Sequence, residues 1–485
     1  MFNFTSLSSD PERLNTIIRE VPKVITDEEY VEKIINEFLS SEKRKEMING
    51  ERYYEGDHDI LSSKRTVIGE GGKIVVVDNL PNNLIIDNQY QKMVDQKKNY
   101  LLGKPIVFGT EENTVYNDLL KSTFNKRFQR LIKNIGEDTL NCGIGWMFVN
   151  YNEHGELDMK RLKPYQVIPL WTDYEHEELS GVIYFYDWET ASGEQIQKVE
   201  IYDESGIYRF IRQESKLLLD DEPFSNYFEV DDEPFNWLNI PIIPWRYNTK
   251  EIPLIRKIKS LQDGINTILS TFMNNMQEDA RNTILILVNY DGQDLGEFRR
   301  NLSQYGAVKV RNDASTGGGD VKTLQVEVNA ENYQAILKVL KNSLIENARG
   351  FDAKDDRLNG EPNQMNIQSM YSDVDLDANE METEFQASFE LLLEFVNAYY
   401  SNNQLGDFDL EDVEVTFNRD ILINESEVIA NIRQSTGVIS RKTLVRNHPW
   451  IDDVDEEMTL IDDEEADSDD YGNAFNKVVT PNEEE

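Results

Sequence analysis

Beyond Pro253 the chain carries two strongly helical stretches, and their spacing leaves few ways to fold. In the first, apolar residues recur every three or four positions over about seven turns, which places them on one helix face: Leu254, Ile258, Leu261, Ile265, Ile268, Phe272 and Met276. The second stretch repeats the pattern at Tyr333, Leu337, Leu340 and Leu344. Residues 283–328 between them predict a compact β-rich insert with a short helix at Leu295–Leu302. We expect the two helices to pack antiparallel, with the insert at their tip.

Each of these helices has a single apolar stripe. Two arrangements can bury the apolar surface that remains exposed after the two helices pack together. A monomer can place the helical hairpin against a β domain. Alternatively, identical subunits can pack side by side in a ring, because such head-to-tail contacts close when the rotation between subunits allows. The residue pattern leaves both arrangements open.

The N-terminal part of the chain mixes helical and strand patterns. Residues 1–25 predict a loosely structured arm, and Asp27 is the expected N-cap of a helix through EEYVEKIINEFLSSEKRKEMINGERYYEG. The strings TVIG at 66–69 and KIVVV at 73–77 predict a hairpin. The segment Asn83–Leu102 is again helical in pattern and ends before a Gly-Lys-Pro turn.

From Ile144 to Val230 the apolar pattern changes to a period of two. Runs such as WMFVNY and GVIYFYDW are rich in β-branched and aromatic residues, which predicts an antiparallel β-rich region. Further on, Ile367–Tyr400 predicts a long helix and VEVTF a single strand. Two short helices are expected at Glu425–Gln434 and Ser440–Asn447.

The charge balance is strongly acidic. With 91 acidic and 49 basic residues, the formal charge is −42. Phosphate binding depends on clustered Lys and Arg, so a protein of this composition that meets DNA is expected to do so without gripping it. The single cysteine, Cys142, excludes an internal disulfide and a cysteine-based zinc site. We find no signal-peptide pattern and no run of about 20 apolar residues, so we expect no membrane partner.

Three blocks of sequence, taken in order, resemble a known family. They are NNLIIDNQYQKMVDQKKNYLLGKPIVF at 82–108, GIGWMFVNYNEHGELDMKRLKPYQVIPLWTDYEHEELSGVIYFY at 143–186, and VTFNRDILINESEVIANI followed by TGVISRKTLVRNHPWIDDVDEE. Together they resemble the portal proteins of long-tailed phages of Gram-positive bacteria, over Tyr30 to Glu465. No single motif is specific to that family, but the ordered set is.

The resemblance implies an α+β portal fold with a β-rich wing, a two-helix stem, a small α/β clip and a helical crown, assembled as a ring of typically twelve subunits. The implied parts are an arm at 1–25, a wing at 26–245, stem helices at 246–282 and 329–349, a clip at 283–328, a tunnel loop at 350–366, a long wing helix with a return strand at 367–418, a crown at 419–465 and an acidic tail at 466–485.

The implied function is the channel at one capsid vertex through which double-stranded DNA is packaged and ejected. Expected partners are further copies of the chain, double-stranded DNA bound without sequence specificity, the terminase large subunit, the major capsid and scaffolding proteins, and the head-completion adaptor. The expected location is the portal vertex of the virion, and the host cytoplasm during assembly. We expect no enzyme activity and no cofactor. The alternatives are another head–tail connector component and a metal-dependent nuclease.

Candidate DNA contacts fall in the predicted tunnel loop. They are two cations and three neutral donors: Lys354, Arg357, Asn359, Asn363 and Gln364. The cations can touch phosphates briefly, or they can pair with acidic residues of the same loop, namely Asp352, Asp355 and Asp356. The sequence leaves both interpretations open.

Two further groups of cations stand out in this acidic chain. The clip group suits either an acidic partner surface or an ordinary solvated face, and consists of Arg299, Arg300, Lys309 and Arg311. The stem group faces either the channel or a neighbouring subunit, and consists of Lys257, Lys259, Lys338 and Lys341.

One acidic run has the spacing of a calcium loop. Positions 1, 3, 5, 7 and 12 of such a loop are matched by Asp373, Asp375, Asp377, Asn379 and Glu384. However, Ala378 stands where the sharp turn requires glycine, and the run lies within a helical pattern. A solvated acidic helix face is therefore the expected structure, and no metal site is predicted.

Two other signals are set aside. The string GEGGK at 69–73 lacks the spacing of a phosphate-binding loop and predicts a hairpin turn. The four histidines have no second ligand at metal spacing, and they are His58, His154, His176 and His448.

Overall fold

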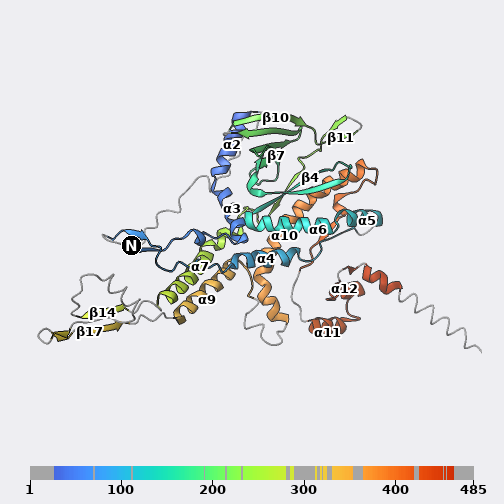
Figure 1. Cartoon of the computed structure of the whole chain (residues 1–485). Helices are drawn as coiled ribbons and strands as arrows, with labels where there is room; N and C mark the ends of the chain where they lie inside the picture. The colour runs from blue at the N-terminus through green and yellow to red at the C-terminus, as the bar shows by residue number, and fades with distance from the viewer. Residues whose placement is uncertain are drawn as a thin grey trace, which may run out of the picture. The chain divides into compact units, whose positions relative to one another are not determined.

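The computed structural model is a mixed structure of helices and antiparallel sheets (Figure 1). It describes residues 27–68, 72–110, 113–190, 192–213, 216–230, 233–279, 284–288, 312–313, 317–318, 320–324, 330–352, 364–419, 425–451, 453–454 and 456–463. The chain divides into two compact units: unit 1 comprises Met1–Glu51, Met93–Arg256 and Ala348–Glu485, and unit 2 comprises Arg52–Lys92 and Lys257–Asn347. The predicted α+β class is confirmed. Among the described helices, none is long and apolar enough to cross a membrane.

The helices and strands have the following bounds. The α-helices are α2 (Glu28–Ser40), α3 (Glu42–Glu55), α4 (Gln89–Leu102), α5 (Thr114–Thr123), α6 (Lys126–Cys142), α7 (Leu254–Asp279), α9 (Ala330–Asn347), α10 (Gln364–Asn402), α11 (Glu425–Ser435) and α12 (Arg441–Arg446), with short 3-10 helices η1 (Asp59–Ser62), η3 (Pro164–Gln166) and η5 (Leu410–Asp412). The strands are β1 (Thr66–Ile68), β2 (Ile74–Val76), β3 (Val107–Gly109), β4 (Ile144–Tyr151), β5 (Leu157–Leu162), β6 (Val167–Trp171), β7 (Leu179–Glu189), β8 (Gln195–Asp203), β9 (Gly206–Gln213), β10 (Lys216–Ser225), β11 (Phe228–Val230), β12 (Glu233–Phe235), β13 (Ile242–Arg246), β14 (Ile284–Val288), β15 (Asn312–Asp313), β16 (Gly317–Gly318), β17 (Asp320–Leu324) and β18 (Glu414–Thr416).

The first described helix begins where the sequence predicts. The Asp27 carboxylate accepts hydrogen bonds from the backbone N–H groups of Glu29 and Tyr30, so it caps α2. The expectation of one continuous helix is wrong, because Ser41 is extended and separates α2 from α3. The Ser41 hydroxyl donates to the carbonyl of Phe38 and accepts from the N–H of Arg44, so one side chain ends the first helix and starts the second.

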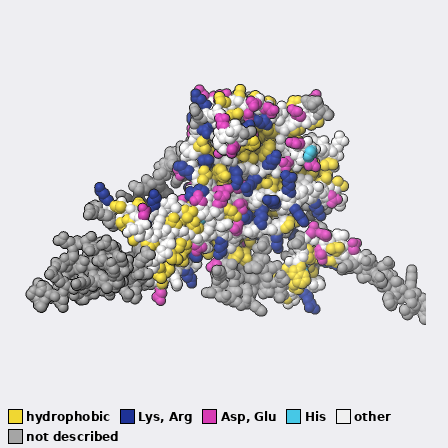
Figure 2. All heavy atoms as spheres, viewed as in Figure 1, with side chains coloured by type: hydrophobic (Ala, Val, Ile, Leu, Met, Phe, Trp, Pro, Cys, Tyr) yellow, Lys and Arg dark blue, Asp and Glu magenta, His cyan; other side chains and the backbone are white. Residues whose placement is uncertain are grey.

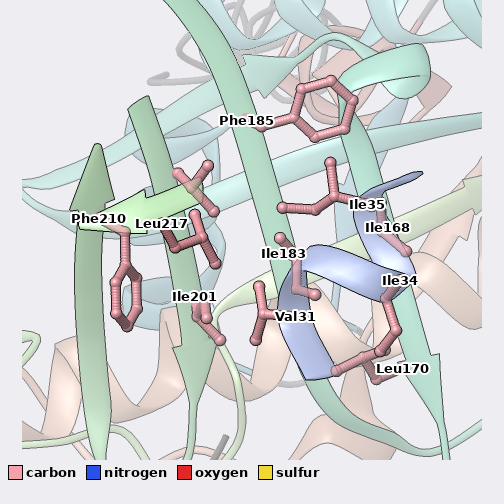
Figure 3. Packing of buried hydrophobic residues seen from close by; sticks show 11 residues of the cluster. Val31, Ile34, Ile35, Ile168, Leu170, Ile183, Phe185, Ile201, Phe210 and Leu217 are labelled. Atoms are coloured by element: carbon pink, nitrogen blue, oxygen red, sulfur yellow. The ribbon is translucent and has the colours of Figure 1, made fainter. Parts of the chain in front are cut away.

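A five-stranded antiparallel meander in the order β10-β9-β8-β7-β6 forms one core of unit 1. One face of it is covered by α2, which places Val31, Ile34 and Ile35 against inward residues of the strands such as Ile183 and Ile201 (Figure 3). All five side chains are at most 3% exposed. Burial of each contributes about 1.5–3 kcal/mol, so α2 is an integral part of the sheet domain. The predicted antiparallel β region is confirmed.

A second sheet of unit 1 joins strands that are distant in sequence. Its order is β13-β4-β5, and α6 and α10 pack against it. The Trp245 ring on β13 lies 5.0 Å from Phe385 and 4.8 Å from Phe389, both on α10. The α6 helix ends at Gly143, whose φ of 85° is the left-handed conformation that favours glycine at a helix C-terminus.

The helices α5 and α6 were missed in the sequence interpretation. Their N-caps are Asn113 and Asn125, whose side chains accept from backbone N–H groups of the first turn. The buried apolar residues Phe128, Ile132 and Ile135 follow helical spacing and could have revealed α6.

Unit 2 contains the helical hairpin expected from the two apolar stripes. The Phe272 ring on α7 lies 5.0 Å from that of Tyr333 on α9, and Asn275 donates to the Tyr333 hydroxyl at 2.9 Å. Nearer the start of α7, Gly264 lies against Leu340. The order of these contacts runs in opposite directions along the two helices, so the predicted antiparallel packing is confirmed. The β1–β2 hairpin is also present, and β14 pairs with β17.

The C-terminal part of the described chain also follows the predicted order. The long helix is α10, and the VEVTF strand is β18, which pairs antiparallel with β3. The two short helices are α11 and α12, the latter capped by the Ser440 hydroxyl. The long helix begins at Gln364, three residues before the predicted Ile367, because no helix-breaking residue follows Pro362.

Candidate functional site

Most of the residues proposed for the tunnel loop and clip lie outside the described part of the chain. These are Lys354, Arg357, Asn359 and Asn363 of the loop, and Arg299, Arg300, Lys309 and Arg311 of the clip. Gln364 was expected in the loop, but it is the first residue of α10. The described residues that bear on the site are those that precede the 353–363 segment and those of α7 and α9.

Two of the four stem lysines are engaged within their own unit. Lys259 Nζ lies 2.6 Å from Asp59 and 2.9 Å from Asp263, and 4.9 Å from the centre of the Tyr53 ring. Burial lowers the pKa of Lys259, but hydrogen bonds to Asp59, Tyr53 and Asp263 outweigh burial and raise it overall. Lys341 Nζ lies 2.6 Å from a carboxylate oxygen of Asp87. Both cations therefore hold unit 2 together.

The other two stem lysines, Lys257 and Lys338, have exposed side chains.

A row of polar side chains on α7 is buried, which the apolar stripe did not predict. Gln262 and Asn266 are fully buried, and Ser270 and Asn274 are each 4% exposed. Their spacing of four residues places them in one line along the helix. They hold the extended segment 83–88, for which the predicted helix is wrong, because α4 starts only at Gln89.

Each of these side chains accepts a hydrogen bond from a backbone N–H of that segment, and we call the set the α7 ladder. The donors are alternate residues, and the pairs are Asn83 to Asn274 at 2.7 Å, Ile85 to Ser270 at 2.9 Å, Asp87 to Asn266 at 3.1 Å and Gln89 to Gln262 at 2.9 Å. Two extended residues advance about 6.6 Å and four helical residues about 6.0 Å, so the two repeats nearly match.

A buried histidine completes the α7 ladder. His58 is 1% exposed, and its ring nitrogens lie 2.8 Å from Asn266 Nδ2 and 3.0 Å from the carbonyl of Tyr53. Burial lowers the pKa of His58. The neutral ring accepts from the amide and donates to the carbonyl, so His58 has a structural role in unit 2.

The acidic run on α10 that resembles a calcium loop is helical and partnered by cations of unit 1. Asp377 lies 2.7 Å from Lys97 Nζ, and Asp375 lies 2.8 Å from Arg419. Glu384 is 3.7 Å from Arg246, whereas Asp373 is exposed. An α-helix cannot fold its carboxylates around one ion as a loop does. The expected helix is confirmed, but the expected solvated face is wrong for Asp377, which is 3% exposed. Cations from α4, β13 and the segment after β18 pair with the run and join it to those elements.

One of these contacts, the Lys97–Asp377 pair, joins α4 to the middle of α10 close to Arg349. The two side chains are 3% and 4% exposed, and Tyr247 donates a hydrogen bond to Asp377 at 2.7 Å. Lys97 also donates to the carbonyl of Arg349 at 3.2 Å. Burial and the nearby Asp377 carboxylate raise the pKa of Tyr247 well above its usual value, so the phenol stays a donor.

The neighbouring residues of α4 fix the same chain end. Gln96 donates to the carbonyl of Phe351 and accepts from its N–H, both at 3.0 Å, and the Phe351 ring lies 4.5 Å from that of Tyr371 on α10. We call Gln96, Lys97, Tyr247, Arg349, Phe351 and Asp377 the loop-root cluster. It holds Arg349 and Phe351, which precede the 353–363 segment, against α4 and α10.

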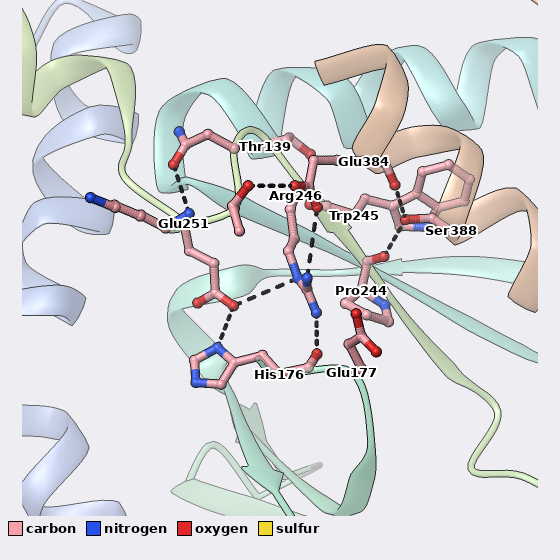
Figure 4. A network of polar contacts seen from close by, with 12 residues as sticks. Thr139, His176, Glu177, Pro244, Trp245, Arg246, Glu251, Glu384 and Ser388 are labelled. Atoms are coloured by element: carbon pink, nitrogen blue, oxygen red, sulfur yellow. Dashed lines mark hydrogen bonds and ion pairs between the residues drawn. The ribbon is translucent and has the colours of Figure 1, made fainter. Parts of the chain in front are cut away.

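A second buried network of unit 1 fixes the turn that leads into α7 (Figure 4). The Glu251 side chain is 2% exposed and pairs with Lys43, with His176 at 2.8 Å and with Arg246 at 3.8 Å. Burial raises the pKa of Glu251, but its contacts with Lys43 and His176 outweigh burial and hold it below its usual range. Both Glu251 and His176 have positive φ, a strained conformation that costs about 1 kcal/mol or more and that the ion pairs offset.

A third buried carboxylate, Asp138 on α6, is poorly satisfied. Arg161 Nε approaches its Oδ2 atom to 3.3 Å, but within the described residues no donor completes a hydrogen bond to that oxygen. Lys163 lies 3.9 Å away and is closer to Glu51, at 2.5 Å. Burial therefore outweighs both cations and raises the pKa of Asp138 to about 7.

Asp138 is expected to make unit 1 less stable as the pH rises. The folded protein retains a proton on Asp138 between pH 3.8 and about 7, whereas the unfolded chain has lost it, so the free energy of unfolding falls across that window. The loss is at most about 4 kcal/mol. The Asp138→Asn variant has no titrating group at this position. We therefore expect its free energy of unfolding, measured in urea, to differ less between pH 5 and pH 8 than that of the unchanged protein. An unchanged difference between the two pH values would contradict the assignment.

Comparison with known proteins identifies the family. The model of the family described as phage portal protein, SPP1 Gp6-like, matches residues 33–471. The chain is 27% identical to the portal protein of Bacillus phage SPP1 over 463 residues, covering 93% of this chain and 90% of that one. It is 27% identical to the portal protein of Clostridium phage phiCD119 over 451 residues, covering 89% of this chain and 96% of that one.

The chain belongs to this family of phage portal proteins. The resemblance found in the sequence is thereby confirmed, and with it the role of a portal in packaging phage DNA. Two solved structures titled as the neck of a GTA particle, native and empty, share 12% identity with it. Their TM-scores are 0.39 and 0.42, and they cover 73% and 79% of this chain and 88% and 95% of the solved chains.

Proposed function

We propose that copies of this chain form a closed ring, typically of twelve subunits, through which double-stranded DNA passes without being gripped. The observation that carries the proposal is the surface of the stem hairpin. Among the described residues of unit 2, Met273, Met276, Ile336 and Val339 on α7 and α9 are 40–62% exposed. Lateral packing against another subunit covers such apolar side chains.

The charge of the chain supports the weak hold on DNA. At −42 per subunit, a ring repels phosphates strongly within a Debye length of about 8 Å. DNA in the channel therefore meets few sites that bind it. The force for translocation comes from a partner protein. We propose the terminase large subunit and later the head-completion adaptor as partners of the clip, and the major capsid and scaffolding proteins as partners at the vertex.

A structural role without catalysis is part of this proposal, and so is assembly in the host cytoplasm. Of the four carboxylates with calcium-loop spacing, Asp375, Asp377 and Glu384 are paired with cations and Asp373 is exposed, which disfavours a catalytic metal site at this run. Negative-stain microscopy of the purified full-length chain tests the assembly directly. Rings with a central hole are expected, and uniform monomers at high protein concentration in physiological salt would refute the ring.

Brief contacts with DNA are assigned to Lys354 and Arg357 of the tunnel loop, with Asn359, Asn363 and Gln364 as neutral donors. The double change Lys354→Ala with Arg357→Ala is expected to leave rings intact and to lower the yield of packaged DNA about tenfold. The control is Lys33→Ala with Lys45→Ala, whose side chains on α2 and α3 are 70% and 56% exposed. Normal packaging by the loop variant would remove both cations from the channel.

A further inference from the structure

A groove on unit 1 is lined by α5, α6, the β4–β5 hairpin and the end of α10. Its volume is about 750 Å³, which is the size of many ligand sites. Cationic side chains line it, including Arg127, Arg130 and Lys160, and so do the largely apolar side chains of Phe128, Leu131 and Tyr399. We call this surface the α6 groove.

The α6 groove is unusually basic for this chain. From Lys126 to Gly136 the sequence of α6 contains four cations, at 126, 127, 130 and 133, and no carboxylate. Figure 2 shows Lys and Arg side chains gathered over the region of α6 in a molecule of charge −42. The concentration of positive charge marks this surface for an anionic partner.

Pairing within the groove leaves positive charge in excess. Asp158 lies 3.2 Å from Arg127 and 3.4 Å from Lys160, so one carboxylate faces two cations. In the part of the chain that the structure describes, no carboxylate lies within ion-pair distance of Arg130. The Arg127 side chain is 84% exposed, so its guanidinium remains accessible to a further carboxylate.

The apolar part of the lining favours a peptide over duplex DNA. Phe128 is 4% exposed and gives the groove an aromatic floor, beside the half-buried Leu131 and Tyr399. Duplex DNA presents phosphates on a convex surface, and it is repelled by the net charge of this chain. An extended peptide with carboxylates and aromatic rings can use both the cations and the apolar floor.

The chain itself contains such a peptide. Residues 464–475 read EEADSDDYGNAF, with five carboxylates in the first seven positions followed by Tyr471 and Phe475. The described chain approaches the groove shortly before this segment, because Asp453 lies 3.9 Å from Lys121, which directly precedes Ser122 of the lining. Ten residues separate Asp453 from Asp463, and a helix of that length spans only about 15 Å. Twelve extended residues reach about 40 Å, so the acidic segment can return to the groove.

We propose that the α6 groove binds residues 464–475 of the same chain, with carboxylates on Arg127, Arg130 and Lys160 and the aromatic rings on the apolar floor. Occupancy by this segment also shields the groove from DNA phosphates. The proposal holds whether or not the stem hairpin forms a ring, because every contact lies within one chain.

Photo-crosslinking in the full-length protein tests the proposal. Tyr471 is replaced by the photo-crosslinker p-benzoylphenylalanine. Irradiation is expected to link residues 464–475 covalently to α6, β5 or the end of α10 of the same polypeptide. The double change Arg127→Glu with Arg130→Glu is expected to lower the crosslink yield about tenfold, as high salt also does. The matched control, Lys33→Glu with Lys45→Glu, makes the same change of charge at exposed sites and is expected to leave the yield unchanged.

Three results would overturn the assignment. The first is a crosslink that maps elsewhere or resists the Arg127 and Arg130 reversals. The second is a product of twice the chain mass on a denaturing gel, since it would place the tail of another copy in the groove. The third is loss of the crosslink on addition of duplex DNA at physiological salt, which would make the groove a DNA site.

Discussion

Replacing Lys97 by Met is expected to lower the free energy of unfolding of unit 1 by about 3–5 kcal/mol. Lys97 and Asp377 are both nearly inaccessible to water and their charged atoms are 2.7 Å apart. Removing the ammonium group takes the nearest cation away from the buried Asp377 carboxylate, which keeps the Tyr247 donor at 2.7 Å and has Arg349 at 3.9 Å. The carbonyl of Arg349 loses its donor as well. The loop-root cluster therefore loses the group that connects α4 both to Arg349 and to α10.

Tryptophan fluorescence during urea unfolding measures this effect selectively. All six tryptophans lie in unit 1, at 146, 171, 188, 237, 245 and 450. The control is Lys33→Met, because the Lys33 side chain on α2 is 70% exposed. A further change of Asp377 to Leu in the Lys97→Met protein is expected to restore part of the stability, since no buried charge is then left unpaired. A loss below about 1 kcal/mol in the single variant would show that the pair is not buried in the assembled protein.

Gln262→Leu is the second change with a large expected effect, and it acts in unit 2. The Gln262 amide accepts from the N–H groups of Gln89 and Tyr90 and donates to the carbonyl of Asp87, each at 2.9 Å. Leucine has nearly the same size but satisfies none of them. The N–H of Gln89 and the carbonyl of Asp87 keep their mutual hydrogen bond of 2.8 Å, so the expected loss is about 1–3 kcal/mol, mainly from the contact to the Tyr90 N–H.

Hydrogen exchange followed by mass spectrometry measures this loss locally, and it does so in a unit without tryptophan. Faster exchange is expected over 83–90 in the Gln262→Leu protein. Thr267→Leu on the exposed side of α7 serves as the control. If residues 83–90 exchanged their amide hydrogens as slowly as in the unchanged protein, the α7 ladder would not stabilise this segment.

The sequence predicted those features of the fold that depend on local patterns. Helical periodicity predicted α7, α9 and α10, and the N-cap residue Asp27 predicted the start of α2, because capping involves only neighbouring residues. Family membership followed from the order of weak motifs along the whole chain. The candidate tunnel and clip cations rest on position alone and stay predictions.

The features that the sequence did not reveal depend on partners far apart in the chain. Lys97 and Asp377 are 280 residues apart, and nothing near either one indicates an ion pair. The polar residues of the α7 ladder looked like the solvated side of an amphipathic helix, although their regular spacing of four was visible. The acidic run of α10 also looked solvated, because its cations come from α4, β13 and the segment after β18.

The hydrogen bonds of the α7 ladder repeat regularly. A shift of segment 83–89 by two residues along α7 would therefore re-form most of them. Local composition blocks that slip at both ends. In one direction Pro81 would have to face Asn274, and proline has no N–H to donate. In the other direction Gln91 would have to face Gln262, but its N–H already donates to the Asn88 side chain at the start of α4. The register between this segment and α7 is thus fixed by the missing N–H of Pro81 and by the Asn88 cap of α4.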